Sequence, residues 1–333
     1  MEFKEPFPPA GADGVPQDPR LQPTPDYGTL GPGSDVAGCA PNPAAPAARK
    51  SQLPLAHLVA AVIGMSAALI VGMTTKAHPA RPGLPASVHN EPASAKDMRQ
   101  IDDMKPQKQA EVLLELAVSH TAGAVEQISS RADRWNGKVE WDSQIASLTN
   151  AALNSNDMKV RESGIEVELA AYGLSKNSAS LDYLLRTAES PDHSQKIWAL
   201  WGLGLMANRG VEPGQIVEVL TRHLDDSDMD SRRWAVEGMA LAGTDQVIQP
   251  LLTTMRNDPS PIVRERAACS LAESGMFTQE QRMTVVPQLI AFTEDPSIDP
   301  QTRQWAFQAL GDIAHQRLPN EPGAWRRWYQ EQR

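Results

Sequence analysis

Hydrophobic and polar residues follow four different patterns along this chain. Residues 1–52 show no apolar period, and residues 53–73 form one continuous apolar run. Residues 74–96 again lack a period, while residues 97–333 carry apolar positions three and four residues apart. That spacing is typical of amphipathic helices, and no stretch alternates β-branched and polar residues as strands do. We therefore predict an all-α protein.

The apolar run at 53–73 contains no Asp, Glu, Lys or Arg. As a helix it would be about 31 Å long, close to the thickness of a bilayer's hydrocarbon core. A signal peptide would have a shorter apolar core nearer the start of the chain. A buried helix of a soluble domain would rarely lack charge over this length. We predict a single transmembrane helix.

Small residues recur every four positions along this predicted helix. Because they fall on one face, two copies of the helix could approach closely and pair as a homodimer. Alanine and glycine are also common in membrane helices that do not associate, so a plain anchor is the alternative. The small residues are Ala60, Gly64, Ala68 and Gly72.

The segments on either side of the run are rich in proline. Eleven prolines and six glycines fall within the first fifty residues, which predicts a disordered tail over 1–52. Residues 74–96 are predicted to be a flexible linker. Basic residues flank both ends of the run, and the closer pair, Arg49 and Lys50, favours a cytoplasmic N-terminus and an extracytoplasmic C-terminal domain.

Four segments of the helical region share one frame, with a basic residue, an alanine three positions later and a large apolar residue four positions after that. An Asp-rich turn precedes each copy, and a second apolar-periodic run follows the first three. We expect stacked helix pairs over 157–333, preceded by separate helices over 97–156. The frame residues are Lys196, Ala199, Leu203, Arg232, Ala235, Met239, Arg264, Ala267, Leu271, Arg303, Ala306 and Leu310.

The copy that runs from Asp258 through Arg264 and Ala267 to Leu271 resembles the repeat of the HEAT family. The resemblance covers about 157–318. It implies a right-handed α-solenoid of about four to five antiparallel helix pairs, which most often serves as a protein-binding scaffold and carries no catalytic residues. We expect each basic frame residue to meet the Asp of a neighbouring turn or to cap helix carbonyls. The terminal helix around Trp325 is expected to seal the last repeat, since repeat arrays need caps.

Charge and motif content narrow the function further. Residues 97–333 hold 34 acidic and 24 basic residues, so this domain carries a net negative charge. We expect it to repel the phosphate backbone of nucleic acid. No metalloprotease, nucleophile-elbow or paired-cysteine motif occurs, and we expect no cofactor and no catalysis. The favoured partner is another protein or a peptide; an enzyme similar to the HEAT-like lyases is the alternative. Glu162, Glu166 and Glu168 are interpreted as a solvated face.

One acidic cluster suggests a third function, which is calcium binding. Asp226, Asp228, Asp230 and Glu237 occupy positions 1, 3, 5 and 12 of an EF-hand calcium loop. The sixth position is Ser231, where that loop needs glycine for its turn, and the segment overlaps a repeat frame. Acidic turns that cap helices explain the same residues, so a calcium-responsive module is the weaker hypothesis.

Overall fold

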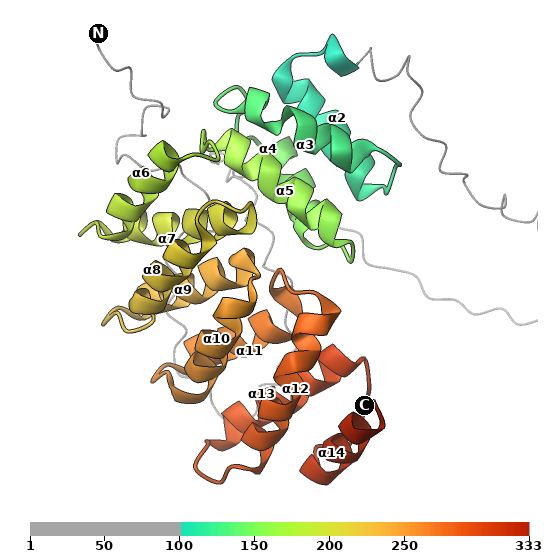
Figure 1. Cartoon of the computed structure of the whole chain (residues 1–333), viewed down its shortest axis with the longest axis vertical. Helices are drawn as coiled ribbons and strands as arrows, with labels where there is room; N and C mark the ends of the chain where they lie inside the picture. The colour runs from blue at the N-terminus through green and yellow to red at the C-terminus, as the bar shows by residue number, and fades with distance from the viewer. Residues whose placement is uncertain (1–100, 333) are drawn as a thin grey trace, which may run out of the picture.

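The computed structural model describes residues 101–332, and every regular element in that range is helical (Figure 1). This confirms the all-α prediction for the described residues. The predicted tail, membrane helix and linker lie outside them. The elements are α2 (Pro106–Val118), α3 (Ala124–Trp135), α4 (Ser143–Leu153), α5 (Met158–Ala171), α6 (Ser178–Ala188), α7 (His193–Asn208), α8 (Pro213–His223), α9 (Met229–Ala242), α10 (Asp245–Asn257), α11 (Pro261–Cys269), the π-helical turn η2 (Ser270–Ser274), α12 (Gln279–Glu294), α13 (Pro300–Ala314) and α14 (Pro322–Glu331).

Short polar side chains fix where many of these helices begin. Each of seven N-cap residues accepts a hydrogen bond on its side chain from a backbone N–H of the first turn, which satisfies a donor that the helix itself cannot. Five helices carry proline in the first turn, where its missing N–H costs nothing, and one of these, α13, also has a side-chain cap. The seven caps are Asp142, Asp157, Asn177, Asp192, Asp228, Thr278 and Asp299.

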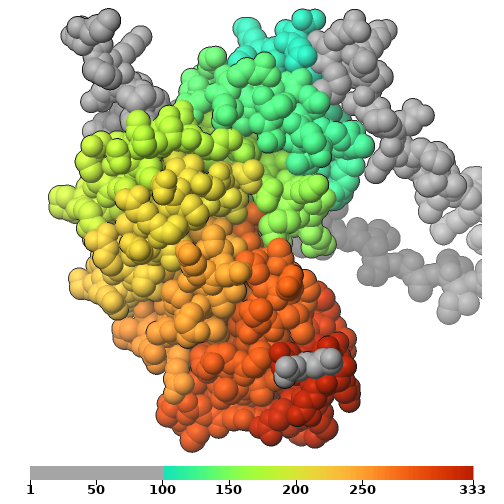
Figure 2. Space-filling view, in the orientation of Figure 1, coloured from blue at the N-terminus to red at the C-terminus, as the bar shows by residue number. Residues whose placement is uncertain are grey.

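The frame found in the sequence lies on α7, α9, α11 and α13, except that Leu271 falls in η2, and each of these helices is followed by a second helix. α7 packs on α9, α9 on α11, and α11 on α13, so the helix pairs stack in chain order, as the succession of colours in Figure 2 shows. All eight apolar frame residues are 0% exposed, and all of them except Ala235 belong to one continuous hydrophobic core. They are Ala199, Leu203, Ala235, Met239, Ala267, Leu271, Ala306 and Leu310.

The contact between α7 and α9 depends on two glycines. A Cβ added to Gly204 would lie 2.4 Å from the carbonyl oxygen of Gly238, and one added to Gly238 would lie 2.5 Å from that of Leu200. Neither distance is possible for real atoms, so the two backbones touch only because both side chains are absent. Gly238 is not one of the three positions that define the frame, so the sequence pattern did not predict this contact.

A second core lies at the N-terminal side of the described residues. It joins α2, α3 and α4 to one face of α5, with Leu113, Trp135 and Ile145 buried inside. The opposite face of α5 contributes Ile165 and Leu169 to the repeat core. α5 does start at the predicted domain boundary, 156/157, but it belongs to both cores, so packing does not divide there.

α5 also runs across the C-terminal ends of the repeat helices. In Figure 1 it extends from the side of α6 toward the orange part of the chain. Glu166 on α5 accepts a hydrogen bond of 2.9 Å from Nε of Arg209, the C-cap of α7. One turn nearer the start of α5, Nη1 of Arg161 donates to the carbonyl oxygen of Gly275, just after η2, at 3.3 Å. The helix therefore links repeats that are distant in sequence.

The last helix closes the stack as expected for a cap. Trp325 on α14 is 1% exposed and belongs to the repeat core, while Trp328 and Tyr329 pack against that core partly buried. The rings of Trp325 and Trp328 meet edge to face with centroids 5.9 Å apart. α14 covers α12, so the apolar surface of the final pair is not left open to water.

Candidate functional site

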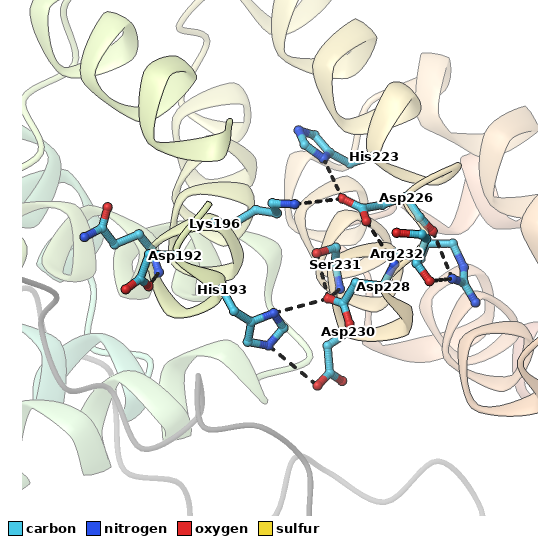
Figure 3. Close-up of polar contacts among 11 residues, drawn as sticks. Asp192, His193, Lys196, His223, Asp226, Asp228, Asp230, Ser231 and Arg232 are labelled. Atoms are coloured by element: carbon cyan, nitrogen blue, oxygen red, sulfur yellow. Dashed lines mark hydrogen bonds and ion pairs between the residues drawn. The ribbon is translucent and has the colours of Figure 1, made fainter. Parts of the chain in front are cut away.

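The turns between repeats are crossed by ion pairs that start from the basic frame residues. Nζ of Lys196 lies 3.0 Å from Asp226, and Nε of Arg232 lies 2.8 Å from Asp258. Each pair joins one repeat to the turn of the next, so the expectation that the basic residue meets a neighbouring Asp holds for both. Figure 3 shows Lys196, Asp226 and Arg232 in this network.

The other two basic frame residues, Arg264 and Arg303, also bind to groups of the inter-repeat turns. Arg264 donates from Nε to the hydroxyl of Thr302 at 2.9 Å and lies 3.5 Å from Asp299, its ion-pair partner in the next turn. It also donates from Nη1 to the carbonyl oxygen of Asp258 at 2.7 Å. Arg303 donates to the carbonyl oxygen of Asp295 at 3.4 Å. Its bond stays within its own turn.

Two histidines join this network, and their place in it was not predicted. Nδ1 of His193 lies 3.2 Å from Asp228 (Figure 3). His223 is 7% exposed and has its Nδ1 3.7 Å from Asp226 and its Nε2 3.7 Å from Glu189. Burial lowers the pKa of His223, although Glu189 and Asp226 oppose that shift. A helix-period pattern assigns no role to such residues, because their partners come from other turns.

Asp226 and Asp228 act as acceptors inside the turn. Burial alone would raise the pKa of Asp226, but hydrogen bonds from the backbone of Asp228 and from Lys196 outweigh it, so the pKa is lowered. Burial is likewise outweighed at Asp228, where the hydroxyl and backbone N–H of Ser231 donate to the carboxylate and lower its pKa. Both carboxylates are therefore ionised and occupied at neutral pH.

The calcium hypothesis does not fit this geometry. α9 begins at Met229, so most of the twelve-residue loop that an EF-hand needs is helix instead. Asp228 caps that helix, and Glu237 forms an ion pair with Arg266 at 2.5 Å. Within residues 101–332 no group of three acidic, His or Cys side chains could hold a metal ion.

The prediction of a solvated acidic face on α5 was wrong for two of its three members. Glu166 is 3% exposed and Glu168 is 0% exposed, whereas Glu162 is half-buried. Glu166 lies between Lys176 and Arg209, each 2.9 Å away, and the two cations make its burial tolerable. Local sequence could not predict this burial, because Arg209 lies 43 residues further along the chain.

A polar cleft opens beside this buried carboxylate. It has a volume of about 410 Å³ and is bounded by α3, α5 and the end of α7. Glu166 and Arg209 form its inner wall, and Glu126, Ser129 and Lys159 lie exposed at its rim. Pockets that hold ligands commonly have volumes of about 300–1,000 Å³, so the cleft is large enough for a side chain or a short peptide segment.

The repeat geometry on these helices agrees with a comparison of the sequence against known families. Residues 181–272 match the family model for HEAT repeats. The match spans α6 to η2, which includes three of the four frame helices. The crystal structure of an engineered protein aligns with 62% of this chain over 96% of its own length, with 16% sequence identity. The TM-score of 0.32 is too low to indicate a shared fold. A comparison with curated proteins finds no match.

Within residues 101–332 no helix is long and apolar enough to span a membrane. The small-residue stripe at Ala60, Gly64, Ala68 and Gly72 lies outside the described residues.

Proposed function

We propose that this chain is a membrane-anchored HEAT-repeat scaffold that binds another protein or a peptide and does not catalyse a reaction. The observation that carries the proposal is the stack of helix pairs, matched over 181–272 to HEAT repeats and locked pair to pair by ion pairs such as Arg232–Asp258. Such stacks present long, rigid surfaces in the form that partner proteins bind.

The cleft between α3 and α5 is the surface that we assign to the partner. Its rim carries side chains of both signs, Glu126 and Lys159, which have no ion-pair partner within 4.0 Å among residues 101–332. Its wall is held rigid by Glu166 and its two cations. Pre-organised polar groups lower the cost of binding, because little side-chain freedom is lost there.

Charge reversal at the rim tests this assignment. Glu126→Arg should reduce recovery of the partner from detergent-solubilised membranes by about tenfold, since it places a cation in the cleft beside Lys159. Glu218→Arg is the matched control, because Glu218 is equally exposed on α8, away from the cleft. Equal recovery by both variants would remove the cleft from the proposal, and a full chain that recovers no partner at all would remove the scaffold function.

The anchor is proposed from residues 53–73, whose uncharged length suits a bilayer. We place the N-terminus in the cytoplasm and the repeats outside it. Protease added to intact cells or right-side-out vesicles should then degrade the repeats and spare the tail. Protection of the repeats would reverse the orientation, and release of the chain by high salt or carbonate would exclude a spanning helix.

A homodimer through the small-residue face is part of the same proposal. Gly64→Leu together with Gly72→Leu should abolish any dimer cross-linked in detergent, because the larger side chains keep the helices apart. Leu58→Ile together with Leu69→Ile leaves the face unchanged and should leave the dimer intact. A dimer that survives the glycine substitutions would leave the helix as a plain anchor.

A further inference from the structure

Two arginines from distant parts of the chain meet at one backbone carbonyl. Arg161, on α5, donates from Nη1 to the carbonyl oxygen of Gly275 at 3.3 Å, and Arg282, on α12, donates from Nη2 to the same oxygen at 2.7 Å. Arg282 is 7% exposed and also donates to the carbonyl oxygens of Leu271 and Glu273, each at 2.8 Å. Two guanidinium groups therefore share one side of the π-helical turn.

Many other buried or half-buried cations in the described residues are paired with carboxylates. Neither Arg161 nor Arg282 forms an ion pair within 4.0 Å among residues 101–332, and their bonds are to carbonyl oxygens. The cations that do form such ion pairs are found in Arg131–Asp102, Lys176–Glu166, Arg209–Glu166, Arg232–Asp258 and Arg266–Glu237.

This arrangement is electrostatically costly. Burial, and after it the nearby charge of Arg161, lower the pKa of Arg282 to about 10, against a smaller opposing effect of Glu273. Burial also lowers the pKa of Arg161, again opposed by Glu273. At neutral pH both groups remain charged, so two like charges are held close together in a domain whose net charge is negative. An anion placed between them would relieve both costs.

We propose that Arg161 and Arg282 form a binding site for an oxyanion, either a phosphate or a carboxylate group. Arg282 forms the fixed inner side, because three carbonyl oxygens hold its guanidinium in place. Arg161 forms the outer side: its Nε and Nη1 are used, and its Nη2 donates to no acceptor in the described residues. A guanidinium with a free edge binds an oxyanion through charge-assisted hydrogen bonds.

Glu273 is the internal competitor for this site. Its side chain is exposed, and it is close enough to influence the pKa of both arginines without forming an ion pair with either. The negative charge of Glu273 would repel a bound anion. Removing the charge of Glu273 should therefore strengthen anion binding, whereas it would have no such effect if the arginines only cap helix ends.

Isothermal titration of the full chain in detergent at low ionic strength tests the site with inorganic phosphate and, separately, with succinate. We expect saturable binding of at least one anion, and the stronger of the two identifies the oxyanion class. Arg161→Gln should weaken it about tenfold, because one charge-assisted contact is lost. Arg256→Gln, which removes an exposed arginine paired with Asp295, should change it less than twofold.

Glu273→Gln supplies the second measurement and keeps both arginines in place. It should tighten binding of the same anion by a few fold. The proposal fails if neither anion binds at 20-fold the protein concentration or above, if Arg161→Gln and Arg256→Gln behave alike, or if Glu273→Gln abolishes binding. Because the probe is an ion alone, the result is independent of the scaffold function.

Discussion

Arg232 shows how much one side chain can do in a repeat turn. Its guanidinium donates to both carboxylate oxygens of Asp258, at 2.8 and 3.1 Å, and to the carbonyl oxygen of Asp226 at 3.0 Å. The side chains of Arg232 and Asp258 are 9% and 2% exposed. A buried pair with this geometry is tolerated only while both partners remain, since either alone would be an uncompensated charge.

Arg232→Met should therefore lower the free energy of unfolding by about 3–5 kcal/mol, because it strands the carboxylate of Asp258. Urea denaturation of the full chain, followed by circular dichroism, measures the change. Arg256→Met is the matched control and should cost only about 0–1 kcal/mol, since Arg256 and Asp295 form an exposed pair. Similar losses in both variants would mean that the buried pair does not hold the repeats together.

His223 gives the fold a dependence on pH. Burial lowers its pKa below the usual 6.5, so the unfolded chain takes up a proton at a higher pH than the folded chain does. The free energy of unfolding should thus fall as the pH falls through 6.5, and level off only below the folded pKa.

His223→Gln should flatten this decline between pH 7 and pH 5.5 in thermal or urea unfolding. His315→Asn serves as the control, because His315 is exposed and Asn tolerates its positive φ of 52°. The interpretation is wrong if the decline is as steep in His223→Gln as in the unchanged chain.

At the scale of single helices, the packing of α9 against α7 is set by glycine rather than by apolar side chains. Gly238 on α9 lies against the backbone of α7, where a Cβ would come within 2.5 Å of the carbonyl oxygen of Leu200. Any side chain at this position forces the two helices apart. The neighbouring frame residues Ala235 and Met239 would then lose their contacts as well.

Gly238→Ala should destabilise the chain by about 1–3 kcal/mol through this overpacking, despite the higher helix propensity of alanine. Gly214→Ala is the control within α8, where an added Cβ meets nothing within 4 Å. It should be stabilising by about 0.5–1 kcal/mol, because only the propensity changes. Thermal unfolding compares the two, and a stabilised Gly238→Ala would contradict the close contact.

α5 is the element whose role the sequence could not supply. Its start at Met158 follows from the cap Asp157, and the expected stack of helix pairs from residue 157 onward made it part of a first ordinary repeat. In the structure it instead serves two cores and reaches across to Gly275 through Arg161. That contact joins residues 114 positions apart, and no local periodicity encodes it.

At the largest scale, local patterns predicted the all-helical class and the repeat frame of residues 101–332. Ala267 and Leu271, for example, were assigned to the repeat frame from spacing alone, and both are fully buried. The cleft and the arginine pair could not be predicted, because they depend on how α3, α5 and α12 come together in space. Glu166 illustrates the limit: only the placement of Arg209 and Lys176 makes its burial possible.

Binding of a partner protein or peptide at the cleft between α3 and α5 is the core of the proposed function. Its most direct test is a photo-cross-linking amino acid at Ser129, an exposed position lining the cleft, in the full chain within native membranes. Gln249, exposed on α10, is the control position. We predict one discrete adduct from position 129, reduced by Glu126→Arg, and none of that size from position 249. Adducts that are the same from both positions, or absent from both, would contradict the claim.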